Sequence, residues 1–234
     1  MIELDGVSVV VPGSRHGQPD RTLLDDVTLR LAEHRICVIG ANGSGKSTLL
    51  RLLNGMRQPT SGSIRVGGHS TVDDVRAVRA QVGFIFTDPL AQLLMSTPIE
   101  DVELSLRATV RNRKERTRAA QQLLEERGIG HLAHQSIYDL SGGERQLVAL
   151  TSVLAVQPRV IVADEPTTLL DLRNKLALRA TFAELPQQVI YSTHDMDVAA
   201  DAQRVIVVDG GRIVADGPPG ESISSYESAM RVGP

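Results

Sequence analysis

The sequence is poor in cysteine and in aromatic residues: its 234 residues include one cysteine, no tryptophan, three tyrosines and three phenylalanines. A single cysteine cannot form a disulfide framework, so a hydrophobic core has to hold the chain together, as is usual in a reducing compartment. The cysteine, Cys37, lies in the apolar run Ile36–Ile39. We therefore expect a small core residue there rather than a reactive thiol.

The sequence also lacks long hydrophobic runs and any excess of basic residues. None of its apolar runs approaches the roughly 18 residues that span a bilayer, and its first residues lack the basic and apolar stretches of a signal peptide. The net charge of −3 argues against a general nucleic-acid binder, so we expect no nucleic-acid partner. If the protein works at a membrane, other subunits must supply the spans.

Glycine, in contrast, is concentrated in a loop at residues 40–48 that reads GANGSGKST. A strand pattern precedes the loop and a helical leucine pattern follows it, which is the order that the G-x-x-x-x-G-K-[ST] phosphate-binding loop requires. Backbone N–H groups of such a loop point at phosphate oxygens, while its Lys reaches the β- and γ-phosphates and its Ser holds Mg²⁺. An ordinary glycine turn is the alternative that the flanking strand and helix disfavour. The nucleotide-binding residues predicted here are Gly40, Asn42, Gly43, Ser44, Gly45, Lys46, Ser47 and Thr48.

Strand patterns occupy both ends of the chain, and helical patterns occupy its middle. Closely spaced strands are predicted at Ile2–Val11 and Val27–Leu31, which favours an antiparallel layer, and a further strand is predicted at Ile64–Val66. From residue 87 to 158 helical patterns dominate. Strands then alternate with helices from Val160 onward, which predicts a parallel sheet covered on both faces. We predict a nucleotide-binding core from residues 1–87 and 159–234 and a helical subdomain from residues 88–158.

A second glycine motif, Leu140-Ser-Gly-Gly-Glu144, opens a helical pattern. Ser141 is a good N-cap and Glu144 lies three residues later, so a capping box alone could explain part of the motif. The functional interpretation is an anion-binding helix N-terminus, where Gly142 and Gly143 let a phosphate approach closely. The motif by itself does not decide between the two.

Two strand ends carry polar side chains that suit catalysis. Asp164 and Glu165 follow the apolar run Val160–Ala163, and as strand residues they are expected to point to opposite faces. Asp164 can support Mg²⁺ from its outer coordination shell, and Glu165 can deprotonate the attacking water. His194 ends the next strand, at the sheet edge where ligands bind. A solvent-exposed charged strand end and a structural histidine are the alternatives.

Taken together, these motifs resemble the ATP-binding cassette (ABC) ATPases from end to end, with Thr168-Leu-Leu-Asp171 and His194 in the order and spacing of that family. The resemblance implies an α/β fold of the P-loop NTPase (RecA-like) type, with an N-terminal antiparallel layer and an inserted helical subdomain. It also implies that two cassettes pair head to tail with ATP and Mg²⁺. Each ATP would lie between the loop of one subunit and the Ser141–Gly143 helix end of the other. Asp171 would link the two sites, and His194 would contact the γ-phosphate.

The chain departs from the family pattern at two positions. Thr87 stands where the family has a glutamine, and its shorter side chain cannot reach both Mg²⁺ and the lytic water as an amide can. The lost contact is worth about 1–3 kcal/mol, which predicts slower hydrolysis or altered coupling. Whether the nearby Gln92 substitutes is left open. Val11 stands where the family stacks an aromatic ring on adenine, and His16 is a candidate replacement.

The stretch from Val82 to Val102, with Phe86-Thr-Asp-Pro89, Gln92 and Thr97-Pro-Ile-Glu-Asp-Val102, is similar to the A components of energy-coupling-factor importers. Biotin-type components are the most similar, and the cobalt and nickel types are close relatives. This resemblance implies a transmembrane T component, a substrate-binding S component, and peripheral attachment at the cytoplasmic face of the membrane. An ordinary amphipathic helix start, with Thr97 as its cap, is the alternative for this stretch.

Three further questions stay open at this point. The cassette could pair with itself or with a paralogue. The C-terminal segment 218–234 has apolar residues at helical spacing, and it either adds to a dimer contact or caps the core. A non-transport or regulatory ABC ATPase acting on ribosomes or DNA is the alternative function, although the chain shows neither a second cassette nor a long coiled-coil insert.

Overall fold

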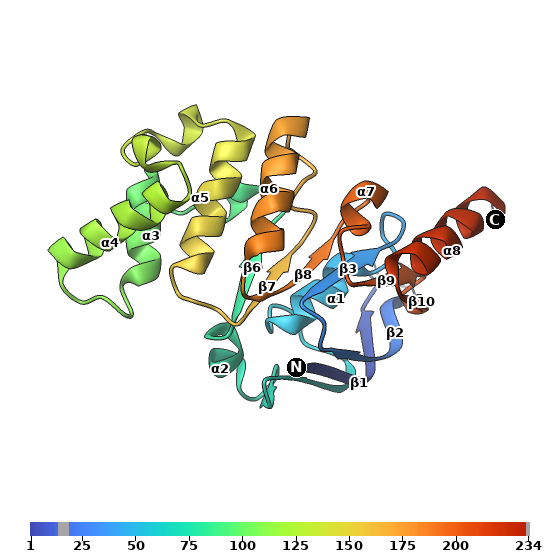
Figure 1. Cartoon of the computed structure of the whole chain (residues 1–234). Coiled ribbons are helices and arrows are strands. Elements are labelled where there is room, and N and C mark those ends of the chain that lie inside the picture. The colour runs from blue at the N-terminus through green and yellow to red at the C-terminus, as the bar shows by residue number, and fades with distance from the viewer. Residues whose placement is uncertain (14–18, 233–234) are drawn as a thin grey trace.

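The computed structural model describes residues 1–13 and 19–232, so the candidate base-stacking residue His16 lies outside the described part. Figure 1 shows two sheets on one side of the molecule and a group of helices on the other. The first sheet is antiparallel and has the strand order β2-β1-β4-β5. Its strands are β1 (Ile2–Val11), β2 (Arg21–Leu31), β4 (Ser61–Val66) and β5 (His69–Ser70).

The second sheet has the strand order β10-β9-β3-β8-β7-β6, and all its pairs are parallel except β10 with β9. Non-consecutive strands lie side by side because helical connections cross over between them. The strands are β3 (Arg35–Ile39), β6 (Val82–Ile85), β7 (Val160–Ala163), β8 (Gln188–Ser192), β9 (Arg204–Asp209) and β10 (Arg212–Gly217).

The parallel sheet buries both of its faces, and β3 illustrates how. Ile36 and Val38 belong to the core shared with the antiparallel sheet and with α1 (Lys46–Leu53), while Cys37 and Ile39 belong to a second core on the opposite face. Successive strand residues point to opposite faces, so a continuous apolar run fits a strand covered on both sides. The second core is completed by α5 (Gly142–Leu154), α6 (Leu172–Glu184), α7 (Met196–Ala199) and α8 (Pro219–Val232). Cys37 is fully buried there, and burial raises the pKa of its thiol well above the usual value.

A third core lies among helices α3 (Pro98–Leu106), α4 (Arg113–Glu126) and the first two turns of α5. Leu124 and Val148 are completely buried in it. The division of the chain at residues 87/88 and 158/159 stays a prediction, but the region between them does have apolar packing of its own.

Most predicted elements are observed within a few residues of their expected ends, but β2 begins at Arg21, six residues before the predicted start at Val27. The short helix α2 (Val75–Arg79) was not expected, and α7 ends three residues early because the chain turns there into β9. Thr97 occupies the N-cap position of α3 but makes no capping bond; its hydroxyl donates to the carboxylate of Glu100 (2.9 Å). None of the helices that the structure describes is long and apolar enough to cross a bilayer.

Candidate functional site

The phosphate loop joins β3 to α1 at the carboxyl edge of the parallel sheet. Gly40, Gly43 and Gly45 all have positive φ angles, of 147°, 79° and 119°. A Cβ added to Gly45 would lie 2.7 Å from the carbonyl oxygen of Leu23, and one added to Gly40 would overlap the backbone of Val208. The loop can therefore curl only because these positions have no side chain.

Two side chains in the loop are buried in a way that suits an anion. The ammonium group of Lys46, which is 5% exposed, donates to the carbonyl oxygens of Gly40 (2.8 Å) and Ala41 (3.2 Å). Ser44 is 6% exposed, and among the described residues its hydroxyl has no hydrogen-bond partner. A buried cation beside an unsatisfied hydroxyl is unfavourable alone, and phosphate oxygens would satisfy both groups.

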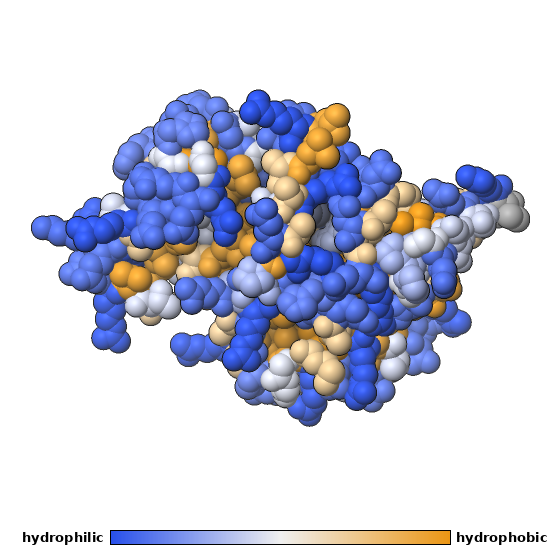
Figure 2. All heavy atoms as spheres, viewed as in Figure 1, coloured by the Kyte–Doolittle hydropathy of each residue, from blue (hydrophilic) through white to orange (hydrophobic). Residues whose placement is uncertain are grey.

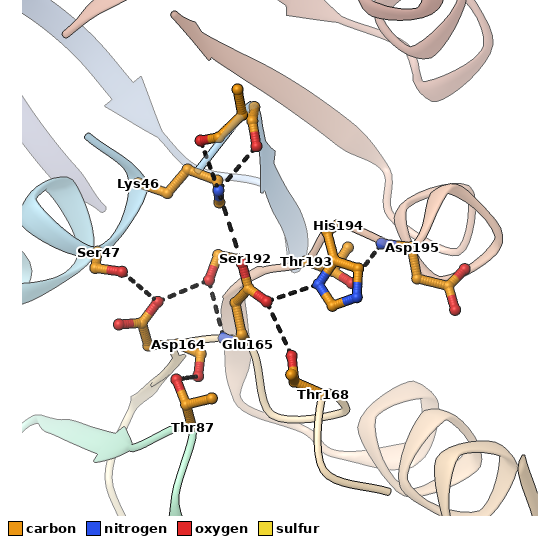
Figure 3. A network of polar contacts seen from close by, with 12 residues as sticks. Lys46, Ser47, Thr87, Asp164, Glu165, Thr168, Ser192, Thr193, His194 and Asp195 are labelled. Carbon is orange, nitrogen blue, oxygen red and sulfur yellow. Dashed lines mark hydrogen bonds and ion pairs between the residues drawn. The ribbon is translucent and has the colours of Figure 1, made fainter. Parts of the chain in front are cut away.

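Asp164 connects three elements at the carboxyl edge of the sheet (Figure 3). Its Oδ1 accepts hydrogen bonds from the hydroxyls of Ser47 at the start of α1 and of Ser192 at the end of β8, both at 2.9 Å. These hydroxyl and carboxylate oxygens are of the type that Mg²⁺ prefers. The described residues contain no cluster of three acidic, His or Cys side chains able to hold a metal alone. Phosphate oxygens and water would have to complete the coordination, which is usual for Mg²⁺ in nucleotide sites.

Glu165 carries the second carboxylate, and its surroundings keep it ionised. Its Oε2 accepts hydrogen bonds from His194 Nδ1 (2.7 Å) and the Thr168 hydroxyl (2.9 Å), and its Oε1 lies 3.7 Å from Lys46 Nζ. Burial opposes ionisation, but the hydrogen bonds and the nearby cation outweigh it and lower the pKa of Glu165. The carboxylate is thus available at neutral pH to accept a proton from water.

The prediction that Asp164 and Glu165 point to opposite faces of a strand is wrong. Strand β7 ends at Ala163, and Glu165 has a left-handed backbone with φ of 49°. Such a conformation costs a non-glycine residue about 1–3 kcal/mol and is found mostly at functional sites. Here the Glu165 amide donates to the hydroxyl of Ser192 (2.9 Å), which fixes the turn and directs both carboxylates into one site.

The Leu140–Glu144 motif forms the N-terminus of α5. The Ser141 hydroxyl accepts a hydrogen bond from the amide of Glu144 (3.3 Å), and the Glu144 carboxylate accepts one from the amide of Ser141 (2.7 Å). This capping box is one of the two interpretations of the motif, and it lowers the pKa of Glu144 through the hydrogen bonds from Ser141. It leaves the first amides of Gly142 and Gly143 open to a ligand.

The cavity above the phosphate loop receives no residue from this helix end. Its lining comes from β2, the loop, α1 and the β7 end: Arg21, Leu23, Asn42, Gly43, Gly45, Lys46, Ser47, Thr48 and Glu165. Asp171 is also absent from the lining, and it caps α6 by accepting from the amide of Asn174 (2.8 Å). Figure 1 likewise shows α5 well separated from α1. Within one chain, the phosphate loop and the Ser141–Gly143 helix end therefore do not form a common site.

Thr87 contacts the backbone of the site, and this contact is different from the one predicted for the glutamine of the family. Its hydroxyl donates to the carbonyl oxygen of Asp164 at 2.7 Å and so ties the end of β6 to the end of β7 (Figure 3). The Gln92 amide is engaged elsewhere: it accepts from the amide of Phe86 (3.2 Å) and donates to the carbonyl of Ala149 (3.4 Å). Gln92 therefore links β6 to α5 and does not take the place of the absent glutamine.

Sequence reasoning missed several residues of this site. Ser192 and Thr168 were read only as parts of motifs, yet their hydroxyls hold the two carboxylates. Arg21 was not considered, although its Nη2 lies 3.7 Å from where a Cβ on Gly43 would be, and it pairs with Val11 in the β1–β2 register. Short hydroxyl residues after the strands were a usable signal for the first two. Nothing local to Arg21 indicated that the β1–β2 hairpin reaches the loop.

A sequence model described as ABC transporter matches residues 24–168. The chain belongs to the ABC transporter family. A protein of Deinococcus radiodurans named as an ABC transporter ATP-binding protein is 40% identical over 230 residues, 98% of this chain and 99% of the relative. The biotin transport ATP-binding protein BioM of Rhizobium etli is 39% identical over 206 residues, 88% of this chain and 92% of that one. The energy-coupling factor transporter ATP-binding protein EcfA1 of Bacillus subtilis is 36% identical over 220 residues, 92% and 78% of the two chains.

Solved structures of ABC cassettes have the same fold. The dimeric ATP-binding cassette MJ0796, in a post-hydrolysis state with ADP and phosphate, matches with a TM-score of 0.82 and 28% identity, covering 94% of this chain and 99% of that one. The structure of cbiO1 from Clostridium perfringens, part of the ABC transporter complex cbiONQ, matches with a TM-score of 0.80 and 26% identity, covering 99% and 93%. The predicted fold class is thus confirmed, and so is the predicted activity: the chain is the ATP-hydrolysing subunit of an ABC transporter.

Proposed function

We propose that two copies of this chain, or this chain and a paralogue, close head to tail around two ATP molecules. The observation that carries this proposal is the one-sided cavity over the phosphate loop, which has no lining from α5 or from Asp171. At the N-terminus of α5 the Ser141 amide is bonded to the Glu144 carboxylate, whereas the amides of Gly142 and Gly143 have no acceptor among the described residues. A second copy, turned head to tail, supplies to each cavity the part that it lacks.

Within such a closed site the residues divide the work. Lys46 and the loop amides bind the β- and γ-phosphates, and Glu165 takes a proton from the attacking water. His194, held against Glu165, contacts the γ-phosphate, while Ser47 with Asp164 behind it holds Mg²⁺. The bound ion supplies neutralisation of charge on the β- and γ-oxygens. ATP and Mg²⁺ are therefore the proposed ligands. The two chains separate after hydrolysis, when the terminal phosphate leaves.

The cycle is proposed to drive import of a micronutrient through separate T and S components at the cytoplasmic face of the membrane. The similarity to EcfA1 and cbiO1, over 92% and 99% of this chain, supports an energy-coupling-factor importer, and the 39% identity to BioM favours biotin over cobalt or nickel. Asp101 of the similar stretch has a structural role that fits this assignment. Its buried carboxylate accepts from the amides of Leu94 (2.9 Å) and Met95 (3.2 Å) and so fixes the loop before α3.

That loop borders a cavity that is the proposed docking place for the T component. The cavity lies between α3, α5 and β6, and its lining includes Gly83, Leu94, Leu104 and Val156. Leu94 is 76% exposed and Val156 is 41% exposed. Figure 2 shows hydrophobic residues gathered on this side of the helical part, next to the sheet. Apolar surface of this kind, rimmed by polar residues, is typical of a protein interaction site.

Purification in mild detergent tests the transport assignment. We expect wild-type protein to bring down one or more integral membrane proteins and to support uptake of labelled biotin by cells that produce the complex. Leu94→Asp is expected to lose both, because it buries a charge in the proposed contact, while its ATP affinity stays unchanged. Val214→Asp, at a residue 58% exposed on β10, is the matched control and should behave as wild type. Wild-type protein that recovers no membrane protein would contradict the importer proposal.

The Thr87 hydroxyl gives a smaller prediction about the reaction itself. Thr87→Val keeps the shape but removes the donor to the Asp164 carbonyl, a loss worth about 0.5–1.5 kcal/mol, or roughly two- to tenfold in kcat. Thr87→Ser keeps the donor and is the control. Thr87→Gln restores the family residue, and we expect it to change the ATPase rate or its coupling to transport. Steady-state kinetics measures the effect of the three substitutions. If all three variants had the kcat of the wild type, Thr87 would have no role in the site.

A further inference from the structure

We propose that the first turn of α6 is a positioning device that connects the α5 N-terminus to the loop of His194 in the same chain, through Asn174 and Lys175. The inference rests on the proposed dimer, in which these two regions belong to different ATP sites. Asp171 caps this same turn, and the amide of Lys175 donates to its carbonyl oxygen (2.9 Å). The turn therefore lies directly behind the residue proposed to link the two sites.

On one side, α6 contacts the glycine motif of α5. A Cβ on Gly143 would lie within 2.6 Å of the Asn174 side-chain oxygen, so the Asn174 carboxamide occupies the space that a side chain at Gly143 would need. The carbonyl oxygen of Leu169, in the loop before α6, similarly lies 3.1 Å from a Cβ on Gly142. The two glycines thus let α6 and its preceding loop pack directly against the helix end, in addition to any approach of phosphate. A shift of the α5 N-terminus therefore changes the space that the Asn174 carboxamide occupies.

On the other side, α6 contacts the loop that carries His194. Lys175 Nζ and Asp195 Oδ2 form an ion pair at 2.6 Å, with both side chains about three-quarters buried. Asp195 follows His194 directly and caps α7, accepting from the amides of Asp197 (3.0 Å) and Val198 (3.4 Å). Its own amide donates to the hydroxyl of Thr193 (3.1 Å) (Figure 3). The ion pair therefore fixes the backbone on the C-terminal side of His194, while Glu165 holds the imidazole ring (2.7 Å).

These two contacts start from adjacent residues on one helical turn, which moves as a rigid unit. His194 belongs to the ATP site built on its own phosphate loop, whereas Gly143 faces the ATP held by the partner in the proposed dimer. Closure on one ATP therefore shifts the turn, and the shift reaches the second ATP through Asn174 or Lys175. The expected consequence is cooperativity between the two sites, carried inside each chain as well as across the interface.

The test compares Lys175→Ala and Asn174→Ala with a matched variant on the same helix. Arg179, one turn further along α6, forms a bidentate ion pair with Asp201 (2.6 and 2.8 Å). Arg179 also donates to the carbonyl oxygen of Asp197 in α7 (3.1 Å), so Arg179→Ala removes a comparable tie from α6 to α7 and the segment after it, but one without a bond to Asp195, His194 or α5. Lys175→Arg keeps the charge and should restore wild-type behaviour.

The measurements are the ATP dependence of hydrolysis, ATP affinity under conditions where the protein is monomeric, and thermal stability. For the wild type we expect a Hill coefficient above 1, approaching the limit of about 2 for two sites. Lys175→Ala and Asn174→Ala should bring it close to 1 and lower the coupling between sites about 2- to 30-fold, with monomer affinity unchanged. Arg179→Ala should keep the wild-type coefficient at a similar loss of stability.

Two different results would overturn the inference, and they are distinguishable from failure of the dimer proposal. If Lys175→Ala and Asn174→Ala stay as cooperative as wild type, or if Arg179→Ala loses cooperativity equally, the turn has no specific positioning role. If the wild type itself hydrolyses ATP without forming a dimer, the proposed function fails first and the inference falls with it.

Discussion

Replacing Glu165 by glutamine is expected to lower kcat by about 10²–10⁴, because the variant loses the carboxylate that accepts a proton from the attacking water. ATP binding is expected to persist, since Glu165 is proposed to face only the terminal phosphate and the residues proposed to bind the phosphates are unchanged. The amide keeps the size of the side chain and can still contact Thr168 and His194. The loss therefore falls on the chemical step, and single-turnover hydrolysis measured with ATP affinity separates the two effects.

Glu126→Gln is the matched control, because Glu126 is an exposed carboxylate at the end of α4. It should leave both kcat and affinity unchanged. The pH profile gives a second readout: because the pKa of Glu165 is below its ordinary value of 4.5, the ionised form persists as the pH falls to that value. Wild-type activity should therefore not lose its base between neutral pH and about 5. A Glu165→Gln variant that turns over within a few fold of wild type would show that the carboxylate is not the base.

Replacing Lys46 by alanine is expected to reduce both ATP affinity and hydrolysis, with a rate loss of roughly 10²–10³. The ammonium group is almost completely buried and lies at the centre of the loop, so its interaction with phosphate is not screened by water. The variant also removes the ammonium group that donates to the carbonyl oxygens of Gly40 and Ala41. These two hydrogen bonds help to stabilise the tight conformation of the loop. We therefore expect binding to fail along with catalysis, unlike in Glu165→Gln.

Equilibrium titration with ATP and steady-state hydrolysis measure the two parts. Lys114→Ala, at an exposed lysine in the first turn of α4, controls for the loss of one positive charge from the chain. Thermal unfolding shows whether the Lys46 variant is folded. Unchanged ATP affinity in a folded Lys46→Ala protein would mean that the loop does not bind the nucleotide through this residue.

How far the sequence determined the fold depends on the range of the interactions. The strand from Ile36 to Ile39 was predictable because burial of both its faces requires a continuous apolar run. The phosphate loop was predictable because its glycines adopt conformations and close contacts that no other residue allows. Helix α2 was missed because it is only five residues long and buries a single side chain, Val78. Thr97 is at the N-cap of α3 as predicted, but its hydroxyl donates to the Glu100 carboxylate and makes no capping bond.

The candidate site was predictable in its members but not in its geometry. Adjacent carboxylates in a strand would diverge, and only the end of β7 at Ala163 and the left-handed Glu165 bring them together. That turn is fixed by Ser192, which arrives from β8 and is 27 residues distant from Glu165. Contacts of this range leave no local pattern. The same holds for Arg21 beside the loop and for Asn174 against Gly143, which only the packing of separate elements reveals.

The proposed closure of two chains around ATP is tested most directly by the mass of the Glu165→Gln protein in solution, measured by light scattering with and without MgATP. The account predicts a dimer that holds two molecules of ATP and forms only in the triphosphate, because the neighbouring helix end completes the site and the slow chemical step keeps it closed. In ADP the same protein should be a monomer. A Glu165→Gln protein that binds MgATP at saturation and remains a monomer, with one nucleotide per chain and no trapped complex, would contradict the account.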